Sequence, residues 1–345
     1  MDSILNYTLE DLEKVMLEMN EKKFKALQIF KWIYQKKVFD FDKMSDIKKS
    51  FIEELKSRFI INPLEEISRQ VSSDGTVKFL FKLDDHEVIE TVLMRFDYGN
   101  SICVTTQVGC NMGCKFCASG LLKRVRNLKT SEIVGQLLKA SEYLLPENGR
   151  VDNIVVMGIG EPFDNYDNMI KFCKIANNSN GLAIGARHIT VSTCGMIEGI
   201  KKFANEKEQF NLAISLHAPN DKIRSDIMPI NKAYNLQTLF NALKYYSDHS
   251  NRRITYEYIM LNDVNDSKED ALELARLVKG KNAYINLIGY NQVDENGYTG
   301  SSNKKILNFY DVLMKNNVKA TIRNKVGDDI DAACGQLRAK HKGIL

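Results

Sequence analysis

The chain has 345 residues, of which 44% are hydrophobic and 27% charged, with a formal net charge of +4 at pH 7. This length suits one large domain with one or two small additions, and the mild basicity permits an RNA partner without requiring one. The first residues lack a basic start followed by an apolar run, and apolar stretches such as INLIGY are strand-sized. We therefore expect neither a signal peptide nor a membrane segment. The seven cysteines are an odd number and do not suggest a disulfide framework, so we expect a reduced, cytoplasmic protein.

The N-terminal region is predicted to be helical. Apolar residues recur at three- and four-residue spacing through TLEDLEKVMLEM, KALQIFKWIYQK and MSDIKKSFIEELKSRF, and Asn62-Pro63 is expected to end this region. The next two stretches, VKFLFKL and EVIETVLMRF, alternate like strands, with a turn at Asp84-Asp85. We expect a helical accessory domain over residues 1–62 and a connecting segment of strands over residues 63–98.

A different pattern begins near residue 100. Six short apolar strands end in polar residues or glycine, and a helical stretch follows each: SICVTTQVGC, NIVVMGIGEP, HITVSTCG, NLAISLHAPND, TYEYIMLNDVND and YINLIGYN. This repetition predicts an α/β fold with a partial (β/α)6 barrel over residues 99–295, followed by a C-terminal extension over residues 296–345. Chemistry in such barrels lies at the carboxyl ends of the strands, where these polar residues fall. A doubly wound open sheet fits less well, because the glycine-rich turns lack a dinucleotide fingerprint.

Three cysteines, Cys110, Cys114 and Cys117, lie in the glycine-rich stretch QVGCNMGCKFCASG. One interpretation is a zinc site completed by Cys103, but zinc cages usually use paired C-x2-C loops, whereas this spacing is C-x6-C-x3-C-x2-C. The other is a four-iron cluster held by three thiolates, with one iron left open for a small molecule.

The remaining cysteines have different surroundings. Cys173, on an apolar helical face, is expected in the core, and Cys194, at a strand end, is expected to be structural. Cys334 lies between an acidic turn and Gly335, so we expect it on an exposed loop.

The C-x3-C-x2-C spacing with Phe116 before the last cysteine resembles the signature of radical S-adenosylmethionine (SAM) enzymes. Over nearly its whole length, the chain further resembles the RlmN-type family of dual-specificity RNA methyltransferases, radical enzymes that modify C2 of adenine in 23S ribosomal RNA and transfer RNA. The matching stretches are FKWIY, MSDI, SSDGTVKF, VIETV, CVTTQVGCNMGCKFC, NLKTSEIVGQ, GIGEP, SLHAPND, PINKAYN, NLIGYN and GDDIDAACGQL. One departure is Gly289, where the family usually has proline.

The resemblance implies a role for each residue that matches the family's pattern. Cys110, Cys114 and Cys117 would hold a [4Fe-4S] cluster. Cys334 would carry a methyl group as S-methylcysteine, Cys103 would form a transient disulfide with it, and Glu90 would accept a proton. The implied contacts to SAM are Gly160, Glu161, Ser192, Ser215, Leu216, His217 and Asn291.

The same resemblance implies a monomer that acts on 23S ribosomal RNA and transfer RNA and receives electrons from a donor such as flavodoxin or ferredoxin. Four basic residues in KRVRNLK, Lys123 to Lys129, are candidates for phosphate contacts, and the basic, aromatic N-terminal helices could grip folded RNA. Two alternatives stay open: an adenine-C8 ribosomal RNA methyltransferase that confers antibiotic resistance, and a zinc-stabilised RNA-binding protein without enzymatic activity.

Overall fold

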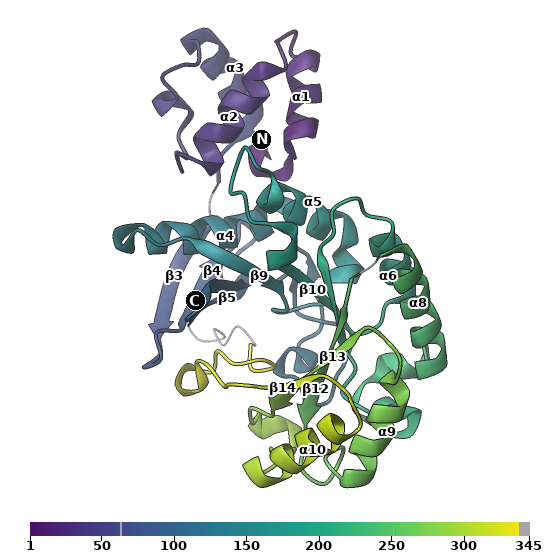
Figure 1. Ribbon diagram of the computed structural model, residues 1–345. Coiled ribbons are helices and arrows are strands. Elements are labelled where there is room, and N and C mark those ends of the chain that lie inside the picture. Colours follow the sequence, from purple (N-terminus) through teal and green to yellow (C-terminus); the bar gives the residue numbers. More distant parts are fainter. Residues whose placement is uncertain (63, 251, 338–345) are drawn as a thin grey trace.

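The computed structural model describes residues 1–62, 64–250 and 252–337 (Figure 1). Its N-terminal part contains α1 (Leu9–Glu18), α2 (Phe24–Tyr34) and α3 (Lys49–Arg58), which confirms the predicted helical region. Two short parallel strands, β1 (Asp2–Ser3) and β2 (Phe59–Ile60), join its ends. Pro63, predicted to end this region, lies outside the described residues.

One ten-stranded sheet follows, in the order β14-β13-β12-β11-β10-β9-β6-β5-β4-β3. Its first four strands in the chain are antiparallel: β3 (Glu65–Val71), β4 (Val77–Lys82), β5 (Val88–Phe96) and β6 (Gly99–Cys103). The predicted turn at Asp84-Asp85 lies between β4 and β5, as expected. The connecting strands therefore extend the same sheet that carries the barrel.

From β6 onward the strands are parallel. They are β9 (Val151–Val156), β10 (Ile189–Thr193), β11 (Asn211–Ser215), β12 (Ile254–Met260), β13 (Ala283–Gly289) and β14 (Ala320–Arg323). The intervening helices are α4 (Thr130–Leu144), α5 (Tyr166–Asn177), α6 (Ile197–Ala204), α7 (Asp221–Ile227), α8 (Leu236–His249), α9 (Lys268–Val278) and α10 (Asn303–Lys315). Figure 1 shows the curved sheet with these helices along its outer side.

The six predicted strand–helix units are present, from β6 to β13. β14 is a seventh parallel strand, which the sequence did not predict because only four residues, ATIR, form it. In the described part of the chain, β14 and β3 are the two free edges of the sheet, so the barrel is partial.

Short elements complete the fold. An antiparallel pair, β7 (Gln107–Val108) and β8 (Arg126–Asn127), closes the loop that carries the three spaced cysteines. The 3₁₀ helices are η1 (Ile4–Asn6), η2 (Phe41–Lys43), η3 (Ala118–Leu121), η4 (Leu145–Glu147), η5 (Pro162–Asn165), η6 (Ala186–His188), η7 (Pro229–Lys232), η8 (Asp294–Asn296) and η9 (Asp328–Ile330). Within the described ranges, no helix has the length and apolar character needed to cross a bilayer.

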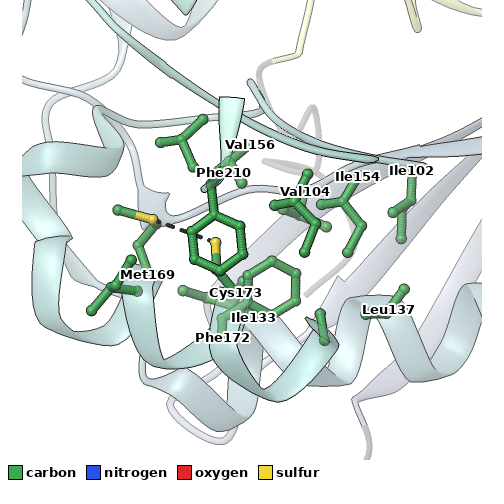
Figure 2. Packing of buried hydrophobic residues seen from close by; sticks show 14 of the residues in the cluster. Ile102, Val104, Ile133, Leu137, Ile154, Val156, Met169, Phe172, Cys173 and Phe210 are labelled. Atoms are coloured by element: carbon green, nitrogen blue, oxygen red, sulfur yellow. Dashed lines mark hydrogen bonds between the residues drawn. The ribbon is translucent and has the colours of Figure 1, made fainter. Parts of the chain in front are cut away.

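The main core lies between the sheet and its outer helices. Figure 2 shows Cys173 of α5 among Met169, Phe172, Phe210 and the apolar residues of α4, β6 and β9. Cys173 is fully buried, and its thiol lies 3.7 Å from the Met169 sulfur. The prediction that this cysteine is a core residue is confirmed.

The last described segment, residues 324–337, is held against two distant parts of the chain. The β3–β4 turn binds one side, because Asp74 accepts the Gly327 N–H at 2.8 Å and the Ser73 N–H donates to Asp329 at 3.1 Å. The cysteine loop binds the other side: the Ala118 N–H donates to the Gly335 carbonyl at 2.8 Å, and Ser119 Oγ donates to the Leu337 carbonyl at 2.8 Å. These contacts bring Cys334 to the barrel interior.

Candidate active site

The carboxyl ends of β9, β10 and β11 and the cysteine loop surround one cavity, which we call the first cavity. The predicted site residues that line it are Cys110, Cys114, Cys117, Gly160, Glu161, Ser192, Ser215, His217 and Cys334. Parallel strands place their carboxyl ends at one edge, which explains why residues so distant in sequence meet there.

The cysteine loop depends on two glycines. Gly109 has a φ of +72°, and a Cβ there would lie 2.2 Å from the Lys123 carbonyl oxygen. A Cβ on Gly120 would lie 2.5 Å from the Cys114 carbonyl oxygen, which instead accepts the Cys117 N–H at 3.1 Å. Only glycine lets the loop fold this tightly around its thiols.

The alternative zinc site gains no support from this geometry. Among the described residues, no three His, Cys, Asp or Glu side chains converge as ligands of one metal ion. A zinc site needs its ligands about 2.0 to 2.3 Å from a single centre. Cys103, its required fourth ligand, does not line the first cavity.

Glu161 is a buried carboxylate at the end of β9, and backbone donors fix both of its oxygens. The Phe163 N–H donates to Oε1 at 3.0 Å and the Cys194 N–H to Oε2 at 2.8 Å. Burial raises the pKa of this carboxyl, and these donors oppose the shift. Next to it, Gly160 has a φ of +107° and lies so close to Gln107 that a Cβ would approach the Gln107 side chain to 2.6 Å. The Gly160-Glu161 turn is therefore rigid.

His217 follows β11 and is buried, with a φ of 57° in the left-handed region. Its Nδ1 accepts the Ile259 N–H at 3.1 Å, so the neutral ring carries its hydrogen on Nε2. Burial, and next the nearby Arg224, lowers the pKa of His217 to about 3, which keeps the ring neutral at pH 7. Phe116 packs edge-on against it, with ring centroids 4.9 Å apart.

The predicted serines lie beside this histidine, on neighbouring strands. Ser192 and Ser215 have their hydroxyl oxygens 3.4 Å apart. Leu216 is fully buried, and its N–H donates to the Glu257 carbonyl at 3.1 Å, so this residue contributes backbone rather than a cavity wall.

Arg224, which the sequence did not identify, holds these strand ends together. Its buried guanidinium donates to the carbonyls of Cys194 at 2.7 Å, Leu216 at 3.2 Å and Ser215 at 3.3 Å. Because it acts through the backbone of other residues, Arg224 is a positioning residue. The structural role predicted for Cys194 is consistent with its buried position and these contacts.

A second cavity adjoins the first. Cys103, Asn291, Arg323, Lys325 and Cys334 are among its lining residues. Cys334 and Arg323 line both cavities, so the Cys334 thiol lies at their common wall. Its side chain is exposed, as predicted, and that exposure is toward these cavities.

Of the three cysteines that line the second cavity, Cys103 and Cys334 both lie within electrostatic range of Arg323. Burial raises the pKa of Cys103 to about 12, and the Cys334 thiol adds to that shift. The pKa of the Cys334 thiol is also raised, because the protein around the two cavities removes part of the hydration of this exposed side chain. The Arg323 guanidinium opposes the increase at both thiols.

Asn291 and Glu90, like Cys103 and Leu216, are predicted site residues outside the first cavity. Asn291 Nδ2 donates to the Cys334 carbonyl at 3.4 Å, while its buried Oδ1 has no hydrogen-bond partner among the described residues. Glu90 is buried with its Oε1 3.7 Å from Lys78 Nζ, and it lines neither cavity. It shares a face of β5 with Val92 and Met94, which do line the second cavity.

The basic run from Lys123 to Lys129 is partly neutralised. Arg124 forms an ion pair with Asp164, and Arg126 pairs with Asp85 and Glu132. Lys123 and Lys129 are exposed and form no ion pair within the described residues. The structure thus favours these two lysines over the arginines for phosphate contacts.

Two further polar residues were missed. Arg323 ends β14, and Glu257, in the middle of β12, has a buried Oε2 that lacks a hydrogen-bond donor in the described part of the chain, 4.0 Å from the Arg323 guanidinium. The position of functional residues at strand ends would have indicated Arg323 if ATIR had been predicted as a strand. It does not indicate Glu257, which lies three residues before the end of its strand.

Comparison with known proteins identifies the family of this chain. Residues 104–275 match the radical SAM superfamily, and residues 3–61 match the N-terminal domain of ribosomal RNA large subunit methyltransferases. A probable dual-specificity RNA methyltransferase RlmN of Spiroplasma citri is 54% identical over 345 residues, covering 100% of this chain and 99% of the relative. The chain belongs to the RlmN family.

Further comparisons agree with this family. The relative of the same name in Streptococcus thermophilus is 55% identical over 342 residues, covering 98% of this chain and 88% of the relative. A crystal structure of a radical SAM methyltransferase from Sphaerobacter thermophilus has a TM-score of 0.94 and 38% identity, covering 99% of this chain and 100% of the other. This similarity extends over both the barrel and the N-terminal helices.

The cofactors of this family are a [4Fe-4S] cluster and SAM. The described residues fit both groups. Cys110, Cys114 and Cys117 lie in one loop and border the first cavity, and cysteine thiolates are the ligands of iron–sulfur clusters. The unpartnered buried oxygens of Asn291 and Glu257 are free to accept hydrogen bonds from a polar ligand.

Proposed function

We propose that this RlmN family member methylates C2 of adenosine 2503 in 23S ribosomal RNA and of adenosine 37 in transfer RNA. The observation that carries the proposal is the position of Cys334 at the wall common to both cavities. A thiol there can receive a methyl group on one side and present it to a base on the other. Adenine C2 lies between two ring nitrogens and is too electron-poor to attack a methyl donor directly, so a carrier is needed.

Three cysteines, Cys110, Cys114 and Cys117, hold the cluster in this proposal. Gly160, Glu161, Ser192, Ser215, Leu216, His217 and Asn291 hold SAM. When bound, these cofactors supply the methyl group, an electron and a 5′-deoxyadenosyl radical. The rigid Gly160-Glu161 turn and the neutral His217 ring are fixed before binding, which lowers the entropic cost of orienting the ligand.

The chain's own residues then act at the second cavity. Cys334 takes the methyl group on its sulfur, and its exposed side chain carries that methyl toward the base. One C–H bond of the carried methyl would be broken by the radical that the bound cofactors supply, and the resulting carbon would bond to C2. Glu90 or Cys103 would accept the C2 proton, and one electron would return to the cluster. Attack of the Cys103 thiolate on the Cys334 sulfur would then form the disulfide and break the bond from that sulfur to the carried carbon, which would take up a proton to become the product methyl group.

The target base has to leave its stack to reach this interior, and the second cavity is mostly apolar with a few polar groups, as nucleobase pockets are. Lys123 and Lys129 would contact phosphates, and the N-terminal helices over residues 1–62 would hold the folded RNA. We further propose that the protein is a cytoplasmic monomer reduced by a flavodoxin- or ferredoxin-type donor. Its seven unpaired cysteines suit a reducing compartment.

The test is reaction of the reconstituted enzyme with ribosomal RNA and with transfer RNA, followed by mass spectrometry of nuclease fragments. We expect the methyl group on C2 of adenine in both RNAs. A methyl group on C8 would establish the resistance-type activity instead. An iron-free protein that binds RNA without modifying it would contradict any enzymatic role.

A further inference from the structure

Tyr98 is the most exposed aromatic residue among those described, with 71% of its surface accessible. It stacks on Phe96 with an interplanar angle of 8° and ring centroids 4.9 Å apart. Single exposed apolar residues are ordinary on protein surfaces. Here the exposed ring is one of a stacked pair, so the pair presents a flat aromatic face to solvent.

The two rings continue the wall of the second cavity. Val92, Met94 and Phe96 alternate along β5 and share one face, so Phe96 lies about 7 Å beyond Met94 along the strand. Met94 lines the cavity, and Phe96 packs against the apolar cluster of Val92, Met94 and Cys103 that forms its wall. A strand of RNA whose base occupied the cavity could leave along this wall.

The turn that carries Tyr98 is rigid. Gly99 has a φ of +119°, and a Cβ there would lie 2.4 Å from an Asp152 carboxylate oxygen. That carboxylate accepts the Asn100 N–H at 2.9 Å, and the Asn100 side chain donates to the Arg150 carbonyl at 2.9 Å. The stacked rings are thus held in place before any ligand arrives, so little conformational entropy is lost on binding.

Positive charge borders the second cavity, where Lys325 Nζ donates to the Tyr290 carbonyl at 3.4 Å. Arg323 and the exposed Lys325 both line the second cavity. Partial burial raises the pKa of Tyr98, and the nearby Arg323 opposes that shift, which places the guanidinium within electrostatic range of the Tyr98 hydroxyl. An occupant of this surface therefore combines a flat π-face with negative charge, and single-stranded RNA has both.

We propose that Phe96 and Tyr98 form a stacking platform for a nucleobase of the substrate RNA next to the target adenine, with Lys325 contacting the intervening phosphate. This inference rests on the proposed RNA methyltransferase function and adds a second recognised nucleotide. Stacking on an aromatic side chain is sequence-tolerant, so it suits an enzyme that accepts two different RNAs.

The experiment measures binding of RNA stem-loops with the target adenine in the loop and 2-aminopurine as its 5′ or its 3′ neighbour. We expect the fluorescence of one of the two probes to be quenched by the native protein. Tyr98→Ala should remove that quenching and weaken binding about tenfold or more, while Tyr98→Phe should stay within about twofold of the native protein. Leu307→Ala, which truncates a similarly exposed side chain on α10, is the matched control and should bind normally.

A third RNA, with an abasic site in place of the 2-aminopurine, tests whether Tyr98 acts through the stacked base. With that probe, the native and Tyr98→Ala proteins should bind equally, because the stacked base is missing. Unchanged affinity of Tyr98→Ala for the quenched probe, quenching of neither probe, or an equal loss with the abasic RNA would overturn the platform. Methylation of RNA by the native enzyme is measured in parallel. If the native enzyme does not methylate RNA, the proposed function is refuted. If both the native enzyme and Tyr98→Ala methylate RNA at the same rate, only the stacking platform is refuted.

Discussion

At the residue scale, the seven cysteines differ by the cavity that each faces. Cys110, Cys114 and Cys194 border the first cavity only, Cys103 borders the second only, and Cys117 and Cys334 border both, whereas Cys173 lies in the core. Chain spacing alone places Cys103 only seven residues before Cys110, which is why a four-thiol cage was an alternative. Cys103 is the last residue of β6, whereas the other three cysteines lie in the loop that follows this strand. Cys103 is therefore fixed by the sheet and not by the cysteine loop.

This separation predicts two classes of cysteine variant. Replacing Cys110, Cys114 or Cys117 by Ala should abolish iron binding and SAM cleavage, because a cluster with two thiolates and an open iron is not retained. Cys103→Ala should keep the cluster, and iron and sulfide assays on the four variants measure this. Equal loss of metal from Cys103→Ala would return the four-thiol site to consideration.

At the scale of elements, the β3–β4 turn acts as a clamp on the segment that carries Cys334. Asp74 accepts the N–H groups of Gly327 and Thr76, both at 2.8 Å. Burial raises the pKa of Asp74, but these hydrogen bonds outweigh burial and lower it to about 2. The ionised carboxylate is thus the form that holds the segment.

Asp74→Ala should therefore loosen residues 324–337. Loss of one hydrogen bond to an exposed carboxylate costs about 1 kcal/mol, which corresponds to roughly fivefold faster exchange of amide hydrogens in this segment. Hydrogen exchange with mass spectrometry measures the effect. Asp248→Ala, which removes an exposed carboxylate of α8, should leave the segment unchanged.

The stabilisation of residues 324–337 by Asp74 should weaken as the pH falls. The folded-state pKa of Asp74 lies below its unfolded value of about 3.9, so the stabilisation is complete above that pH and is lost as the pH falls toward 2. Protection of residues 324–337 should fall over that window in the native protein and not in Asp74→Ala. The same fall in both proteins would assign the effect to other carboxylates.

At the scale of the whole molecule, the sequence predicted those features of the fold that leave a local pattern of apolar and polar residues. The six strand–helix units and the polar residues at their ends follow from local patterns, and five of the seven predicted SAM contacts line one cavity. Local patterns could not predict the contacts between segments that are distant in the chain. The Ser73–Asp329 and Ser119–Leu337 hydrogen bonds join residues 256 and 218 positions apart, and no local signal indicates that they place Cys334 between two cavities.

The same limit explains the residues that were missed. Arg323 ends a strand of four residues, too short to show a period, and Arg224 lies in a helix of seven residues where an arginine usually faces solvent. Both became recognisable only when their carbonyl and carboxylate neighbours were known. The methyl-carrying role of Cys334, in contrast, is a prediction from the family resemblance, and the fold adds that this residue borders both cavities.

The most direct measurement of the central claim, that Cys334 carries the methyl group between the two cavities, is mass spectrometry of the peptide containing this cysteine. Enzyme isolated from cells should carry a methyl group on Cys334, and Cys334→Ala should neither be methylated nor modify RNA. Cys103→Ala should retain the methyl carrier but fail to release the product, so a nuclease-trimmed nucleotide should remain bound to Cys334. An unmethylated Cys334 in active native enzyme, or adenine methylation by Cys334→Ala, would contradict the account.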